Sequence, residues 1–312
     1  MNTLSAIVGL LFVVLPGLTL FWLYRTRAKS RLYFLAIVVF VIVFVFTTVF
    51  SYGYWFSVGM YWPIILVSAL IGILFIRFKR GLPTEWLPRL WSKEFFLFSM
   101  ILMLTLVSGM ALPFLFRAKS FKGIALDLAF PLRGGTFVIL AGGANWSVNM
   151  HAYTGGPQDR YAYDIARLNA FGMRAAGLSP TQLERYEVFG ADVVAPCSGE
   201  VIEVEDGFPN QPPLSPDFNN LYGNHIVIFC HNHSVLLAHL QAGSVFIQAG
   251  DFVETGQLIA SVGNSGSTLE PHLHIHAVLG RHGYQEQRTN SLEGVPLKLG
   301  GRFMIKHEWF TN

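Results

Sequence analysis

The 312-residue sequence has few charged residues, and they are unevenly distributed. Only 13% of the residues are charged, which excludes a disordered tail or a coiled coil as a description of the chain. Residues 1–122 contain only two acidic residues and no histidine, and their net charge is +10. Residues 123–312 have a net charge of −7 and contain all ten histidines. Because this second part is acidic, a nucleic-acid-binding protein is not expected.

Cysteine is also scarce, since Cys197 and Cys230 are the only two in the chain. There is no Cys-x-x-Cys pair, so the sequence does not predict a cysteine zinc site. An oxidising compartment would permit a disulfide between the two residues. The sequence alone leaves open whether they pair, because it does not give the distance between them.

Three long stretches contain no charged residue, namely 1–24, 32–76 and 95–116. A membrane-spanning helix needs about 20 apolar residues, and the middle stretch is long enough for two. We therefore expect four spans, near 4–24, 33–52, 60–77 and 95–116, with a break between Gly53 and Pro63. No span has an ionisable residue in its middle, which favours an anchor over a transporter or channel.

The basic residues follow the first and third expected spans, at Arg25 to Arg31 and at Arg77 to Lys93. Basic loops stay in the cytoplasm, so we expect the N-terminus and the C-terminal domain outside it. Residues 1–24 lack the basic start of a signal peptide. We expect an anchor over 1–116, a linker over 117–128 and a separate domain over 129–312.

From about Leu128 onward, short β-type runs alternate with turn residues, and no internal repeat is visible. One helix is expected after Ser179-Pro180, where Thr181, Gln182 and Glu184 resemble a helix start. Many short strands with little helix predict an antiparallel sandwich or a partly open barrel. The expected strands are 136–140, 200–205, 225–230, 235–240, 257–262 and 273–278.

Three histidine features could support chemistry. In Pro271-His272-Leu273-His274, strand geometry puts both histidines on one face, about 6.5–7 Å apart. One could bind a metal while the other acts beside it. His239 lies in an apolar strand, where a lone histidine is more often a core residue. The third feature is His151 with Asp164; a carboxylate and two imidazoles leave one open position on tetrahedral zinc.

All of these residues except His151 lie within segments that together resemble the lysostaphin/LytM-type zinc metallopeptidases, over roughly residues 130–280. The segments occur in the family's order, and they are Tyr161 to Ile165, Ala195 to Val201, Tyr222 to Asn224, Ala238 to Leu240, Gly250 to Gln257, Gly263 to Gly266 and Pro271 to His274. The resemblance implies antiparallel sheets around a groove. It also implies that Asp164 and His274 are metal ligands and that His239 and His272 are the catalytic pair.

One position departs from the family pattern. The family has its first ligand histidine four residues before the aspartate, where this sequence has Arg160. A guanidinium stays protonated and cannot bind zinc. His151 is the best replacement, because Gly155-Gly156-Pro157 could form a loop that returns it to the site. Without such a replacement the site would be degenerate, and the domain would bind cell wall or a partner without cleaving it.

The resemblance implies a zinc metalloendopeptidase that holds one zinc ion and hydrolyses peptide cross-links of bacterial peptidoglycan through a metal-activated water. Its location would be the bacterial inner membrane, with the domain on the periplasmic or cell-wall side. We expect peptidoglycan peptides and the lipid bilayer as partners, while a protein partner stays open. Tyr222, Asn224 and His276 are candidates for the substrate groove. The alternative is a catalytically degenerate scaffold or activator of another hydrolase.

A carrier domain is a further alternative, since Ala195 to Val201 and Gly250 to Gln257 are also similar to segments of lipoyl and biotinyl carriers. Those carriers are modified on a lysine. Because no lysine occurs between Lys122 and Lys298, this alternative is not favoured.

Overall fold

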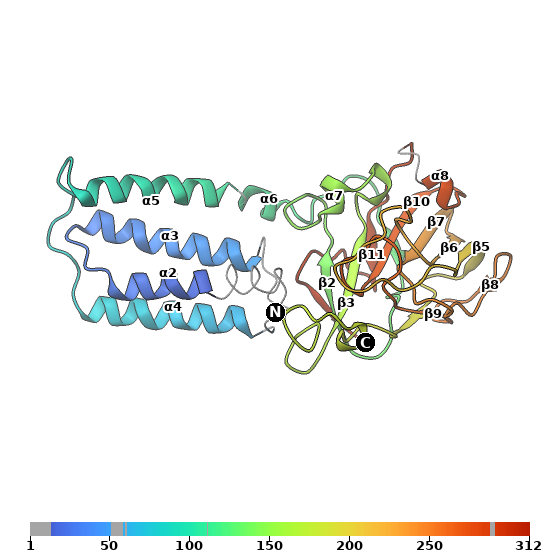
Figure 1. Cartoon of the computed structure of the whole chain (residues 1–312). Helices are drawn as coiled ribbons and strands as arrows, with labels where there is room; N and C mark the ends of the chain where they lie inside the picture. The colour runs from blue at the N-terminus through green and yellow to red at the C-terminus, as the bar shows by residue number, and fades with distance from the viewer. Residues whose placement is uncertain (1–13, 51–58, 60, 111, 288–290) are drawn as a thin grey trace. The chain divides into compact units, whose positions relative to one another are not determined.

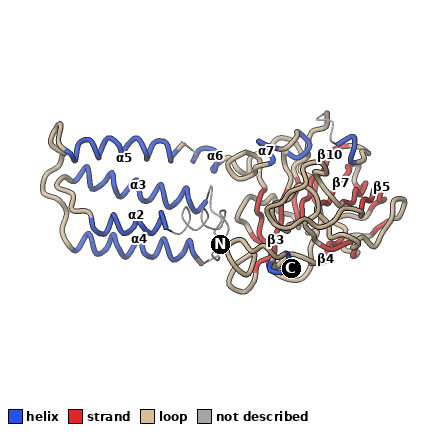
Figure 2. Tube along the Cα trace, viewed as in Figure 1, coloured by secondary structure: helices blue, strands red, loops and turns tan. Residues whose placement is uncertain are grey.

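The structure of the protein is a computed structural model, and it describes residues 14–50, 59, 61–110, 112–287 and 291–312. The chain divides into two compact units, Met1–Leu115 and Phe116–Asn312. The first unit is helical, and the second consists mainly of β-strands and loops (Figures 1 and 2).

The helical unit contains helices that lie side by side (Figure 1), namely α2 (Leu15–Arg25), α3 (Arg31–Phe50), α4 (Trp62–Lys79) and α5 (Lys93–Gly109), followed by the short α6 (Leu112–Phe116). Leu23, Ile37 and Val41 are fully buried between them. Other large apolar side chains point outward, and Ile64 and Phe75 of α4 are 62% and 60% exposed. Exposed apolar surface of this extent is typical of a face that contacts lipid or another protein.

The prediction of about four membrane-spanning helices is not supported. Among the described residues, α4 is the only helix both long and apolar enough to cross a membrane, with a mean hydropathy of 1.9 over 18 residues. The apolar part of α3 in those residues covers Arg31–Phe46, while α2 has 11 residues and α5 has 17. At about 1.5 Å per residue, the described parts of α2 and α5 are shorter than a hydrocarbon core of about 30 Å. Much of the first expected span and the expected break near Gly53 lie outside the described residues.

The last expected span, 95–116, is not one continuous helix, because α5 ends at Gly109 and α6 begins at Leu112. Pro113 explains the interruption. A proline ring collides with the carbonyl four residues earlier, here Gly109, and proline has no N–H to donate. Pro63, in contrast, lies in the first turn of α4 as predicted.

The β unit is built around an eight-stranded antiparallel sheet with the order β12-β2-β3-β10-β7-β6-β5-β8. Two small sheets pair β1 with β11 in parallel and β4 with β9 antiparallel. The strands are β1 (Leu126–Leu128), β2 (Thr136–Ala141), β3 (Tyr163–Leu168), β4 (Asp192–Val194), β5 (Gly199–Glu205), β6 (His225–Cys230), β7 (His233–Ala238), β8 (Phe252–Val253), β9 (Leu258–Ser261), β10 (Leu273–Leu279), β11 (Leu297–Leu299) and β12 (Trp309–Thr311). The predicted mainly β, antiparallel fold is confirmed.

All six strands expected from the sequence are present, as β2, β5, β6, β7, β9 and β10. The helix expected after Pro180 is wrong, because only a single 3-10 turn forms there, over Leu183–Arg185. A short helix is only marginally stable without tertiary packing. Here packing favours an irregular path that buries Tyr186 and Val188, and the Tyr186 hydroxyl donates to the Pro180 carbonyl at 3.0 Å.

Cys197 and Cys230 form a disulfide, which settles the pairing that the sequence left open. It joins the residues before β5 to the end of β6, and the two Cα atoms are 6.3 Å apart. In the chain-entropy view, a cross-link that closes a loop of this size stabilises the fold by about 3–4 kcal/mol. The disulfide thus secures one end of the β5–β6 hairpin.

Candidate metal centre

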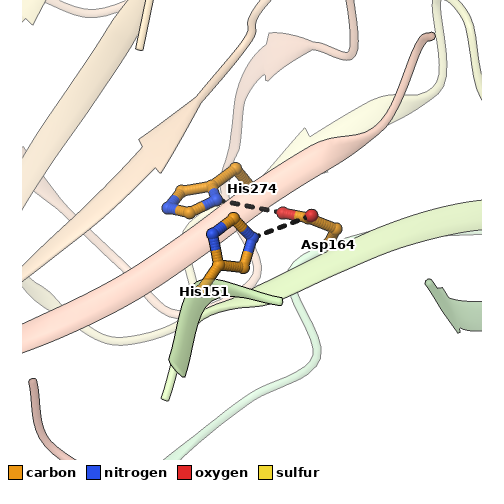
Figure 3. A group of neighbouring side chains, drawn as sticks. All are labelled: His151, Asp164 and His274. Carbon is orange, nitrogen blue, oxygen red and sulfur yellow. Dashed lines mark hydrogen bonds and ion pairs between the residues drawn. The ribbon is translucent and has the colours of Figure 1, made fainter. Parts of the chain in front are cut away.

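Two of the expected ligands face each other across neighbouring strands. In the antiparallel pair β3–β10, Asp164 lies directly opposite His274. Directly opposed side chains on one sheet face have Cβ atoms about 4.5–5.5 Å apart. Asp164 Oδ1 accordingly lies 3.0 Å from His274 Nδ1 (Figure 3).

His151 comes from the short helix α7 (His151–Thr154) and reaches the same carboxylate. Its Nε2 lies 2.8 Å from Asp164 Oδ2 (Figure 3). The buried Asn149 fixes the start of α7, because its Oδ1 accepts from the His151 backbone N–H at 3.1 Å. Its Nδ2 donates to the carbonyls of Gly143 and Ala162, which ties α7 to the strands beside it.

The donor set fits a zinc ion. One ligand atom from each of His151, Asp164 and His274 lies within 4.8 Å of the other two. Two imidazole nitrogens and one carboxylate, with a fourth position open, are the usual donors of a catalytic zinc site. Arg160 takes no part, because its side chain is exposed and lies over the Tyr161 ring at 5.5 Å.

The other two expected site residues, His239 and His272, lie beside this donor set, and their ring centroids are 4.8 Å apart. Their Nδ1 atoms lie 2.9 Å from the Ser265 carbonyl and 2.8 Å from the Glu270 carbonyl. A carbonyl oxygen only accepts, so each Nδ1 carries the proton and each Nε2 is left for chemistry. His272 Nε2 lies 3.4 Å from Asp164 Oδ1, which puts it at the donor set.

Two glycines allow the Ser265 carbonyl to reach His239. Gly223 and Gly266 both have positive φ angles, 54° and 82°. A Cβ on Gly223 would collide with the backbone of Ser265, and one on Gly266 with the backbone of Gly223. Only glycine permits this contact between the two loops. His239 itself has a φ of 62°, a costly conformation for a non-glycine residue that the surrounding contacts hold in place.

Burial and charge have opposite effects on the site histidines. Burial, with the charges of His272 and His274 beside it, holds the pKa of His239 well below its usual range. Burial also opposes protonation of His272, but the Asp164 carboxylate outweighs it and raises the pKa. Burial disfavours the Asp164 carboxylate as well, yet His151 and His272 hold its pKa well below its usual value. Asp164 is therefore charged at neutral pH.

The far side of His274 meets a second group that the sequence did not reveal. His274 Nε2 lies 3.0 Å from His276 Nδ1 and 3.6 Å from Asp159 Oδ1. The Tyr222 hydroxyl donates to the same Asp159 oxygen at 2.6 Å. Asp159, His274 and His276 also lie close enough together to hold a cation. His274, however, has one ring nitrogen directed at each of the two groups. The Nδ1 side faces His151 and Asp164, so the second group can orient His274 for that site.

A chain of hydrogen bonds sets the proton positions of His276 and His274. The Gln287 amide nitrogen donates to the His282 carbonyl at 2.9 Å, so Gln287 Oε1 must face His276. His276 Nε2 therefore donates to that oxygen at 2.8 Å, and His276 Nδ1 accepts from His274 Nε2–H. This leaves His274 Nδ1 directed at the Asp164 carboxylate, 3.0 Å away, where a metal ion would take the place of the proton between them. An outer hydrogen bond of this kind fixes the tautomer of a ligating histidine.

Asp159 and Gln287 are the two residues that sequence reasoning missed. Asp159 lies five residues before Asp164, in a segment considered only for its histidine and Asp164. A carboxylate so close to a ligand was the available signal. Gln287 lies beyond the residues that carry the family resemblance, in the short helix α8 (Tyr284–Gln287), and only tertiary folding brings it to His276.

Two cavities of about 390 Å³ and 520 Å³ both reach His151. Tyr222, a groove candidate, lines the smaller one together with His239 and His274. The groove prediction is wrong for Asn224, which is fully buried and bonds to the backbone of Phe208 and Leu240. It is also wrong for His276, which is 1% exposed and lines neither cavity.

Comparison with known proteins gives the family of part of the chain. Residues 185–287 match Peptidase family M23 and are a LytM-type domain, so this part of the sequence prediction is confirmed. The matched segment includes His239, His272 and His274, whereas His151 and Asp164 precede it. No curated protein matched the chain.

Solved structures with similar regions include two peptidases. A zinc-containing peptidase from Vibrio cholerae is 20% identical with a TM-score of 0.31, and the match covers 55% of this chain and 39% of that one. The catalytic domain of lysostaphin from Staphylococcus simulans is 23% identical with a TM-score of 0.25, and the match covers 38% and 82%.

Proposed function

We propose that the chain is a membrane-anchored zinc endopeptidase that hydrolyses peptide cross-links of bacterial peptidoglycan outside the cytoplasm. The observation that carries this proposal is the arrangement around Asp164. Its carboxylate meets His151 and His274, and the free Nε2 of His272 lies 3.4 Å away. The match of residues 185–287 to Peptidase family M23 supports a peptide substrate.

His151, Asp164 and His274 would hold the metal, leaving the fourth position open. When bound there, zinc would polarise the scissile carbonyl and lower the pKa of a water to about 7. His239 and His272 then provide one proton acceptor and one hydrogen-bond donor at their Nε2 atoms. This pair can take the proton of the attacking water and stabilise the oxyanion that forms on the carbonyl.

The two cavities that His151 lines offer room for a peptide. Their lining includes Trp146 and Tyr222, whose rings offer apolar surface to a chain lying across the site. The net charge of −7 over residues 123–312 does not favour strong electrostatic attraction to an anionic wall. Recognition would therefore depend on the shape of this groove.

Three observations support an extracytoplasmic domain on a membrane anchor. Helix α4 has the length and hydropathy of a membrane span, and its outward side chains are apolar. The basic residues from Arg77 to Lys93 follow it, as the positive-inside rule requires of a cytoplasmic loop. The Cys197–Cys230 disulfide is typical of an oxidising compartment. A reporter fused after Asn312 should be active only if it functions outside the cytoplasm.

The enzymatic proposal is tested by incubating the full chain with purified sacculi, with and without a chelator. Mass spectrometry of the released material would identify the bond that is cut. We expect release that a chelator abolishes and added zinc restores. No chelator-sensitive release would favour the non-catalytic scaffold, although that alternative does not explain why three ligand atoms and two oriented histidines converge at one place.

A further inference from the structure

The helical unit contains a further cavity, of about 770 Å³, lined by the arginines Arg25, Arg27, Arg77 and Arg80. Arg25 ends α2, Arg27 lies in the loop that follows, Arg77 is in the last turn of α4, and Arg80 comes directly after it. Its other lining residues carry no charge. Four cations at one cavity repel one another, and this cost falls when an anion binds between them.

Acidic residues do not neutralise this cavity. The only two in residues 1–122 are Glu85 and Glu94, and both have partners elsewhere. Glu85 pairs with Arg89 at 3.4 Å, and Glu94 accepts from the Lys29 backbone N–H at 2.7 Å. Within the part of the chain that the structure describes, none of the four cavity arginines forms an ion pair.

Two of the guanidinium groups are held in place. Arg80 Nη2 donates to the Tyr24 hydroxyl at 2.8 Å, and its guanidinium carbon lies 4.5 Å from the centre of that ring. Arg77 lies over the Phe34 ring at 5.2 Å. Its Nε is shielded from solvent and has no hydrogen-bond partner among the described residues. An unmade hydrogen bond on this shielded donor carries a cost in free energy.

The wall of the cavity is ordered by contacts between the start of α3 and the loop after α4. The Arg31 and Leu32 backbone N–H groups donate to the carbonyls of Glu85 and Trp86, at 2.8 Å and 3.0 Å. Arg31 Nε donates to the carbonyl of Pro83, which itself lines the cavity, at 2.9 Å. The start of α3 and the loop after α4 are thus joined, so the arginines are presented by a defined structure.

We propose that this cavity binds a phosphate group, as carried by an anionic phospholipid headgroup or by free inorganic phosphate. Guanidinium groups match phosphate oxygens through paired N–H donors, and basic pockets between membrane helices suit lipid headgroups. A role limited to orienting the chain in the membrane would require basic loops, but not a cavity lined by four arginines that form no ion pair among the described residues. The lipid source depends on the proposed membrane insertion, whereas the phosphate site does not depend on the peptidase activity.

The test uses the full chain purified in a zwitterionic detergent. Binding is measured to phosphatidylglycerol, to phosphatidylcholine and to inorganic phosphate. Arg77→Gln/Arg80→Gln should weaken binding of the phosphate-bearing ligand at least tenfold, because hydrogen bonds to charged groups are lost. The control variant Arg89→Gln/Lys93→Gln also removes two positive charges, but outside the cavity. It should change binding less than about twofold.

The outcomes separate the two sources. Preference for phosphatidylglycerol over phosphatidylcholine without binding of inorganic phosphate identifies a lipid headgroup. Binding of inorganic phosphate without a preference for phosphatidylglycerol identifies free phosphate. Wild-type chain that binds neither would overturn the proposal, as would equal binding by the Arg77/Arg80 variant. If that variant fails to fold, Arg25→Gln/Arg27→Gln replaces it, because both side chains are exposed, and unchanged binding by this variant would also overturn the proposal.

Discussion

The helical unit and the β unit contain polar groups in contrasting settings. Around the helical cavity, four arginines have no carboxylate partner among the described residues. In the β unit, the nitrogens of the site histidines face carbonyls, carboxylates or one another. Hydrogen-bonded side chains of this kind are held in the fixed positions that catalysis needs, whereas arginines without acidic partners favour binding of an anion. The predictions below test whether the two regions are separate in function.

Removing a metal ligand should have the largest effect. His274→Ala and His151→Ala are expected to lose stoichiometric zinc, and hydrolysis of sacculi should fall at least about a thousandfold, because water is then not activated. The Arg77→Gln/Arg80→Gln variant should retain zinc and hydrolysis. Metal analysis and product release measure both. Full zinc retention by His151→Ala would rule out its assignment as a ligand.

Removing a histidine that acts beside the metal should separate chemistry from metal binding. His239→Ala is expected to retain zinc, since its Nε2 is free and its Nδ1 is tied to the Ser265 carbonyl. The rate of hydrolysis should fall about 10²–10⁴-fold, as expected for loss of a general acid or base. Zinc content and kcat are measured on the same preparation. Loss of zinc together with activity would instead make His239 part of the metal-binding set.

The buried ion pair behind His272 should be important for stability. Arg174 donates to both oxygens of Glu270 at 2.7 Å and 2.6 Å, and the Glu270 carbonyl accepts from His272. Arg174→Ala leaves a carboxylate largely buried without its partner and should lower the free energy of unfolding by about 3–5 kcal/mol.

The matched control for Arg174 is the exposed pair of Arg281 with Glu200, which has the same two-bond geometry at 2.8 Å and 2.6 Å. Arg281→Ala should lower the free energy of unfolding far less than Arg174→Ala, because solvent screens the exposed pair. Both values come from denaturant unfolding of the full chain in detergent. Equal losses from the two variants would contradict the role assigned to burial.

The outer hydrogen bonds of His274 should tune metal affinity. Asp159→Asn and Gln287→Leu leave every proposed ligand in place, but they disturb the groups that orient His274. Zinc affinity is expected to fall about 10–100-fold, the range typical of such partners. Competition with a chelator of known affinity measures it. Unchanged affinity in both variants would show that His274 is positioned by its strand alone.

Zinc binding should also depend on pH. Burial opposes a charge on His274, but Asp159 and Asp164 outweigh it and raise its pKa to about 9 in the metal-free site. Zinc must displace that proton at lower pH, so its affinity should rise about tenfold per pH unit from pH 7 and level off above about pH 9. The same competition assay, repeated over pH, tests this. An affinity independent of pH would contradict it.

The site was predictable from the sequence where local geometry determined it. The alternation of a strand puts His272 and His274 on one face, and the family segments bring in His239 and Asp164. Strand β3 was not predicted, so the direct opposition of Asp164 and His274 emerged only from the register of the sheet. Asn149, which fixes the start of α7 and hence His151, also acts through tertiary contacts.

The remaining differences arise where tertiary packing outweighs local preference. After Pro180 a helix is predicted, but the chain follows an irregular path that buries Tyr186. Over 95–116 one long apolar helix is predicted, but it is interrupted beside Pro113. Asn224 had been assigned to the groove from its family segment, but its amide is used to join Phe208 to Leu240. A sequence pattern does not show which partners a buried polar side chain will meet.

Zinc K-edge X-ray absorption on the full chain tests the central claim most directly. The account predicts one zinc per chain with two imidazole nitrogens and carboxylate oxygen at about 2.0–2.2 Å. It also predicts no sulfur at about 2.3 Å, because both cysteines are in the disulfide. In His151→Ala, zinc should be substoichiometric, and the spectrum of any zinc that stays bound should show one imidazole fewer. A chain without stoichiometric zinc, or a spectrum that His151→Ala leaves unchanged, would contradict the account.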